Sequence, residues 1–429
     1  MDHFMQSGRI GVSASLALIA SLVTGSLSTP SANAQEARMA FTSRIGGEGP
    51  GSSKIARASV AKYEELLDLS DDMRIAVAAL YDGYDAAYGQ AAQSRRKTIE
   101  AARANLEEDS HPGPEFFQQM SAAQRTFAEE GAKLEAAFFA DVKSLLTERE
   151  VQDNWPAVER LRRREVQMRN SLVSGEGVDL VAIVQSMKVA PSVRALPAEL
   201  GAAVLEYELE LDRKLEAKER ESAAASPLEM GAGGIDLEAM RKQMAASKEM
   251  ANSIKDLNGR HARKIAAVLP EDRRDEFEKL VRLKTYPRVY RDSKASRAAK
   301  VALELSDLGE SKKAALREAL SRYERDAAAV NEAWARAIED QEKGEGEGAI
   351  AAAGGAVFRM STGDEPKALT EARQARRELD KRLREAVDGE LTPEQAEAVT
   401  KSVESVQESD GEHEGVMMEA VQLRIGGPG

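Results

Sequence analysis

The sequence contains no cysteine and very few aromatic residues. Among its 429 residues there are four histidines, and phenylalanine, tryptophan and tyrosine together make up 4%. The absence of cysteine excludes disulfide bonds, thiolate metal sites and a cysteine nucleophile. Runs of alternating β-branched residues joined by hairpin turns are also absent, so the sequence predicts an all-α protein with no significant β-sheet.

Charged residues, by contrast, are abundant. They make up 31% of the chain, and much of the 42% of hydrophobic residues is alanine. This composition is typical of long amphipathic helices with narrow apolar faces, as in helical bundles and coiled coils. The net charge of −13 repels phosphate backbones, so nucleic acid is not an expected partner.

The N-terminal residues have the features of a secretory signal peptide. An apolar run at 10–25 follows Arg9, and Ala34 ends a small-x-small cleavage site. We expect cleavage between Ala34 and Gln35, which removes residues 1–34; the alternative is that this segment stays as a membrane anchor. No later stretch approaches a membrane span, so the sequence predicts a periplasmic or secreted protein with no stable membrane span after cleavage.

An apolar row recurs three times along the chain. Aligning Leu146, Leu269 and Leu391 gives spacings of 123 and 122 residues, and stepping back four, eight and twelve residues from each leucine gives twelve positions. These seam positions are Leu134, Phe138, Val142 and Leu146; Leu257, His261, Ile265 and Leu269; and Leu379, Leu383, Val387 and Leu391. All but His261 are apolar, which is typical of the buried face of an amphipathic helix.

Each seam leucine is followed by a junction between two predicted helices. Thr392 can cap the next helix, with Pro393 at the first helical position and Gln395 at the third. Thr147 and Glu150 repeat this S/T-x-x-E/Q capping box. The sequence therefore predicts that a new helix begins just after each of these leucines.

A second junction lies upstream in each repeat. Ser70 and Ser306 end short apolar runs and are followed by aspartate, a favourable residue at a helix N-terminus. In the middle repeat Pro197 and Pro270 stand where a cap is expected, so side-chain capping is lost there. The predicted junction residues are Leu69, Ser70, Leu146, Thr147, Glu150, Leu196, Pro197, Leu269, Pro270, Leu305, Ser306, Leu391, Thr392, Pro393 and Gln395.

The repeats predict an extended helical bundle or hairpin array of three related units and about a dozen helices. Breaker-rich stretches at 107–115, 223–234 and 343–356 are expected to join two long helices within each unit. The predicted units span 59–173, 178–284 and 285–407. A flexible N-terminal segment at 35–58 and a disordered, acidic and glycine-rich tail at 408–429 are expected outside them.

The paired junctions resemble the LTxxQ-motif family of periplasmic helical proteins, the Spy/CpxP-like group. "LTPEQ" at 391–395 matches the motif fully, and "LTERE" at 146–150 matches it in part, with Glu150 in place of glutamine. "LDLSDDMR" at 67–74 resembles the family's early junction, with Ser70 in place of threonine. The resemblance implies a helical cradle, often dimeric, with a role in ATP-independent chaperoning or envelope stress. The acidic charge of this chain departs from the basic concave face of the best-known family cradles.

The predicted function is binding rather than catalysis. We expect an ATP-independent, chaperone-like or envelope-stress protein that binds exposed polypeptide on helical apolar surfaces, with a homo-oligomer possible. The alternative is a structural helical repeat protein that docks a specific envelope protein. No G-x-S-x-G, H-E-x-x-H or P-loop motif occurs, so we predict no enzyme, no catalytic residue and no cofactor.

Two polar features have both a functional and a structural interpretation. His413 lies beside Glu412 and Glu414, where it could bind a metal, but a disordered acidic tail is the favoured interpretation and no metal site is predicted. Arg160 and Arg162–Arg164 could bind an anionic partner such as lipid headgroups, but a charged helix face is favoured.

Overall fold

A computed structural model describes most of the helical part of the chain. The described residues are 38–42, 54–104, 114–169, 171–190, 195–224, 237–344, 350–353, 356–361, 366–411 and 421–423. Within these ranges the chain forms thirteen helices and four short strands, which confirms the predicted all-α class. No helix in the described ranges is both long and apolar enough to cross a membrane.

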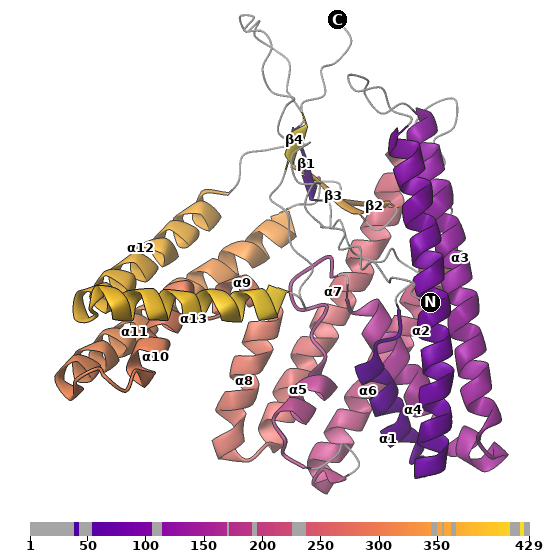
Figure 1. The fold of residues 1–429 in the computed structure, drawn as a ribbon. Helices are drawn as coiled ribbons and strands as arrows, with labels where there is room; N and C mark the ends of the chain where they lie inside the picture. Colours follow the sequence, from indigo (N-terminus) through magenta and orange to yellow (C-terminus); the bar gives the residue numbers. More distant parts are fainter. Residues whose placement is uncertain are drawn as a thin grey trace, which may run out of the picture. The chain divides into compact units, whose positions relative to one another are not determined.

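Twelve of the helices fall into three sets of four, each with a short helix, two long helices and a helix of intermediate length. The first set is α1 (Arg57–Leu67), α2 (Asp71–Ala104), α3 (Pro114–Ser144) and α4 (Glu148–Gln167); the second is α5 (Leu180–Ser186), α6 (Ala198–Ala224), α7 (Leu237–Val268) and α8 (Glu271–Thr285); the third is α10 (Lys294–Glu304), α11 (Glu310–Gly344), α12 (Lys367–Glu390) and α13 (Pro393–Gly411). A single turn, α9 (Pro287–Tyr290), connects the second set to the third. In each set the two long helices pack along each other, α2 on α3, α6 on α7 and α11 on α12 (Figure 1).

The seam positions form the centre of these hairpins. Nine of the twelve are buried, and Leu134, Leu146 and Leu391 are partly buried. Each helix set has its own hydrophobic cluster, around Val142 in the first, Ile265 in the second and Val387 in the third. In each set, the apolar residues at every fourth position therefore form the centre of a narrow hydrophobic core.

The three cores are filled by different side chains. The first contains a chain of aromatic contacts, with ring centroids 5.4 Å apart for Tyr88–Phe127 and for Phe138–Phe139, and 5.8 Å apart for Phe139–Trp155. The third includes four alanines of α10, namely Ala295, Ala298, Ala299 and Ala302, beside leucines and valines of the later helices. The aromatic side chains are thus concentrated in the first core.

Two helices begin with reciprocal hydrogen bonds between a threonine and the residue three positions later. The Thr147 N–H donates to Glu150 Oε2 over 2.8 Å, and the Glu150 N–H donates to Thr147 Oγ1 over 3.3 Å. At the start of α13, Thr392 and Gln395 make the same pair of bonds, at 3.0 and 3.3 Å. The bond from the Thr147 backbone lowers the pKa of Glu150. Pro270 precedes α8 without a side-chain cap, because proline offers no side-chain acceptor.

Ser306 does not cap the next helix, which corrects the predicted junction. The turn at 306–308 places Leu308 in the third core, 3% exposed, and α11 begins only at Glu310. Ser70 does lie next to the start of α2, where its Oγ accepts a 3.4 Å hydrogen bond from the Met73 N–H. Burial of one leucine thus shifts the helix start in the third set.

The N-terminal segment predicted to be flexible at 35–58 includes a residue of the first core. Ile55 is buried, its N–H donates to Tyr84 Oη over 3.0 Å, and its carbonyl accepts from Tyr81 Oη over 3.0 Å. The two tyrosines satisfy the backbone of an extended segment before α1, so the ordered part of the first set begins ahead of residue 59.

A small antiparallel sheet joins segments that were expected to be loops or termini. Its strands are β1 (Arg38–Thr42), β2 (Ile350–Ala353), β3 (Ala356–Ser361) and β4 (Val421–Leu423), in the order β2-β3-β1-β4. Phe41 pairs with Phe358 on one side and with Val421 on the other. β1, β2 and β4 lie inside the stretches at 35–58, 343–356 and 408–429 that were expected to be flexible or breaker-rich. The pairing of β1 with β3 and β4 connects residues that are more than 300 positions apart.

The capping box at α4 gives a first test of the junction. Thr147→Ala removes the acceptor of the Glu150 N–H and is expected to lower the free energy of unfolding by about 1 kcal/mol, whereas Thr147→Ser keeps the hydroxyl and costs only a few tenths. Urea unfolding followed by far-ultraviolet circular dichroism measures both. Equal stability of the alanine and serine variants would contradict the assigned cap.

Candidate functional site

Of the predicted junction residues, the leucines belong to the hydrophobic cores, whereas the threonines and serines are exposed. In each helix set the leucines of the early and late junctions share one hydrophobic cluster, with Leu69 and Leu146 in the first, Leu196 and Leu269 in the second, and Leu305 and Leu391 in the third. In the third set the junctions also bond directly, since Gln395 Nε2 donates to Asp307 Oδ2 over 2.9 Å. Ala34, Gln35 and His413 lie outside the described residues.

The arginine run on α4 forms an ion-pair ladder with neighbouring helices. Arg163 makes a bidentate contact with Asp212 of α6, with N–O distances of 2.8 and 2.9 Å. Arg162 bonds to Glu135 of α3 at 3.0 Å and to Glu219 of α6 at 3.3 Å. These arginines therefore face acidic side chains of the protein itself, which favours the structural interpretation over an anion-binding surface.

Arg164 is the most buried member of this ladder. Its side chain is 6% exposed and contacts two acids, Glu208 of α6 and Asp179, the N-cap residue of α5, the latter at 3.3 Å. Arg160 Nε lies 3.3 Å from the second oxygen of Glu208. Charges this buried require partners, because an isolated one would lose its hydration without compensation.

A basic groove is lined by residues of α8 to α12 and of the segment that follows α4. Its volume is about 1250 Å³. Seven basic and two acidic side chains line it: Arg169, Lys279, Arg282, Lys284, Arg291, Arg297 and Arg376, with Asp292 and Glu324. The excess of positive charge is unusual in a chain of net charge −13. The Nε atom of Arg297 is buried and has no hydrogen-bond partner within the described residues.

The floor of the basic groove is held in place by hydrogen bonds. Tyr323 Oη donates to Asp380 Oδ1 over 2.6 Å and lies 3.0 Å from Ser293 Oγ. Burial, with the bond to Asp380, raises the pKa of Tyr323 to about 12, so its hydroxyl stays protonated at neutral pH. Arg376 bonds to the Val289 carbonyl over 3.1 Å and stacks over the Tyr323 ring at 5.5 Å. The groove therefore combines hydrogen-bonded, buried polar groups with exposed lysines and arginines of α8.

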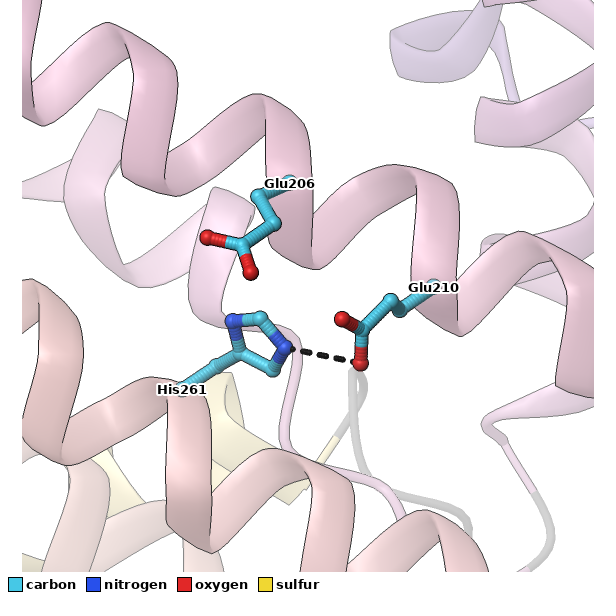
Figure 2. A group of neighbouring side chains, drawn as sticks. All are labelled: Glu206, Glu210 and His261. Atoms are coloured by element: carbon cyan, nitrogen blue, oxygen red, sulfur yellow. Dashed lines mark hydrogen bonds and ion pairs between the residues drawn. The ribbon is translucent and has the colours of Figure 1, made fainter.

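A cluster of two glutamates and one histidine lies between α6 and α7 (Figure 2). Glu206 and Glu210 are one helical turn apart on α6, and His261 faces them from α7. His261 Nε2 lies 3.1 Å from Glu210 Oε2, and this hydrogen bond lowers the pKa of Glu210. One potential metal-ligand atom of each residue lies within 4.8 Å of the others.

This cluster was not predicted, although one signal for it was visible. His261 is the one polar residue among the twelve seam positions, where the corresponding residues are Phe138 and Leu383. Its glutamate partners are 51 and 55 positions away along the chain, so only the packing of α6 on α7 brings them together.

Comparisons with known proteins do not identify the chain. Scans of protein-family models, curated proteins and solved structures found no significant match. The resemblance to the LTxxQ-motif family therefore stays a prediction based on the junction sequences.

The ladder gives a test that separates buried from exposed ion pairs. Arg164→Ala leaves Glu208 and Asp179 without their buried cation and is expected to cost about 3 kcal/mol of unfolding free energy. The matched control is Arg149→Ala on the same helix, which removes an exposed pair with Asp153 and should change stability by less than about 0.5 kcal/mol. Urea denaturation of both variants provides the comparison, and equal losses would contradict the structural role of Arg164.

Proposed function

We propose that this protein is a helical scaffold of the cell envelope or a secreted compartment that docks an acidic segment of a partner polypeptide. The observation that carries the proposal is the basic groove, in which seven of the nine charged lining residues are cationic. A positive groove on an otherwise acidic protein attracts acidic chains by long-range electrostatics and repels basic ones.

Residues at the rim of the groove are available to a ligand. Lys279, Arg282 and Lys284 of α8 are exposed, and the two lysines form no ion pair within the described part of the chain. Within the described ranges, the ion pair of Arg282 is a 3.8 Å contact with Glu278 of the same helix. Because these charges contribute little to the stability of the fold, they can contribute to the association rate and specificity of binding.

The packing of the apolar faces favours a scaffold over a general chaperone. Among the described residues, the large apolar side chains that are exposed are Ile75, Leu145, Leu205 and Leu209. Capture of unfolded polypeptides requires a contiguous apolar patch, and four residues spread over α2, the α3–α4 turn and α6 provide little of one.

The groove predicts charge-dependent binding of an acidic peptide. Lys279→Gln, Arg282→Gln and Lys284→Gln together should weaken binding of a labelled glutamate–serine peptide about tenfold, at about 0.5 kcal/mol for each charge. Fluorescence anisotropy measures the affinity, which should also fall as salt is added.

A control variant separates the groove from the net charge of the protein. Arg149→Gln, Lys242→Gln and Lys401→Gln together remove three exposed cations that do not line the groove. Wild-type affinity in this variant supports the groove as the docking site. An equal loss in both triple variants would contradict it.

An ATP-independent chaperone is the second candidate, and one feature favours it. Leu205 and Leu209 lie one turn apart on α6 and are 49% and 40% exposed. If this stripe captures clients, the protein should suppress light scattering by a denatured reporter protein in ATP-free buffer, and Leu205→Gln with Leu209→Gln should abolish the effect. Absence of suppression by a well-folded wild-type protein would exclude this function and leave the scaffold.

A further inference from the structure

His261 occupies a core position that does not require a polar ring. Its side chain is 1% exposed, and the two related seam positions hold Phe138 and Leu383. Nε2 bonds to Glu210, but Nδ1 is buried and has no hydrogen-bond partner within the described residues. A buried ring nitrogen without a partner costs free energy that an apolar residue at this position would not.

The unpartnered nitrogen faces a carboxylate. Figure 2 shows Glu210 beside Nε2 and Glu206 near the edge of the ring that carries Nδ1. Since Glu210 accepts the hydrogen bond of Nε2–H, Nδ1 is left with its lone pair directed to the space beside Glu206. A carboxylate that holds one ring nitrogen while the other binds a metal is the usual second-shell arrangement of histidine ligands.

We propose that Glu206, Glu210 and His261 form a site for a divalent transition-metal ion such as Zn²⁺. His261 Nδ1 and the Glu206 carboxylate coordinate the ion, Glu210 orients the imidazole, and water completes the coordination. A nitrogen ligand with carboxylate oxygen selects zinc, copper or nickel over magnesium and calcium, which prefer oxygen alone.

The distances suit binding after a small movement of one side chain. Bonds from zinc to nitrogen or oxygen are about 2.0–2.2 Å long, so two ligand atoms of a tetrahedral ion lie about 3.4 Å apart. One ring nitrogen of His261 and one carboxylate oxygen of each glutamate lie within 4.8 Å of one another. A rotation of the Glu206 side chain would bring its oxygen to the shorter distance that a shared ion requires. Glu206 is exposed, so its carboxylate is in contact with solvent.

Two cations of α7 compete with a metal for the carboxylates. Lys264 Nζ lies 2.7 Å from Glu206 Oε1, and Arg260 lies 3.9 Å from Glu210 Oε2. Lys264 and Glu206 are both about half exposed, so their ion pair is weak and an arriving ion can displace the lysine. Binding of the ion would add a link between α6 and α7 and stabilise the second helix set.

Zinc titration of the full-length, tag-free chain tests the site. Isothermal calorimetry should find a binding event that is lost in Glu206→Gln and in His261→Leu, and weakened about 10–100-fold in Glu210→Gln. Lys264→Gln should tighten binding several-fold, because it removes the competing cation. His261→Leu carries the residue of the related position Leu383, so its core is expected to remain packed.

A control and a second readout complete the test. Glu216→Gln removes an exposed carboxylate of α6 outside the cluster and should bind zinc as the wild type does. Zinc should raise the midpoint of thermal unfolding of the wild type and of Glu216→Gln, but not of His261→Leu. Equal zinc binding by the wild type, Glu206→Gln and His261→Leu would overturn the proposal and indicate ions held by scattered surface carboxylates.

Discussion

Each helix set depends on one apolar residue in every four along its second long helix. With 4% aromatic and 31% charged residues, the chain lacks the apolar volume for a thick common core. Every set therefore closes its own narrow core around residues such as Val142, Ile265 and Val387, and the remaining faces stay charged. Contacts beyond a single core are partly polar, as in the ladder between α4 and α6. They are partly apolar where Val289 of α9 and Ala335 of α11 share a small cluster.

The parts of the fold that the sequence predicted are those with local physical signals. The spacing of apolar residues and the capping of helix ends depend on residues only a few positions apart. The helix starts predicted after Thr147 and Thr392 are therefore present in the structure. Ser306 has the same local signal, but burial of Leu308 competes with it and moves the start of α11. The four-stranded sheet was missed because β1 pairs with strands more than 300 positions away, which no local pattern records.

In the candidate sites, too, the sequence shows which residue types are present but not which residues become their partners. The arginine run on α4 was visible in the sequence, but its acidic partners on α6 lie 44 to 57 positions further along the chain. The same holds for His261, whose polarity in the seam was visible while Glu206 and Glu210 were not identified as neighbours. The basic groove draws on five helices and the segment after α4, so its charge excess emerges only when the helices are packed.

The ladder between α4 and α6 also has a direction. All of its cations, Arg160 and Arg162–Arg164, lie on α4, and α6 contributes only acids to it. Two copies of α4 could not pair in this way, nor could two copies of α6, because like charges would then face each other across a partly buried joint. Because the charges of the ladder are of one sign on each helix, α4 of the first set pairs with α6 of the second set and not with a second α4. The same charges disfavour the exchange of equivalent helices between sets or between molecules.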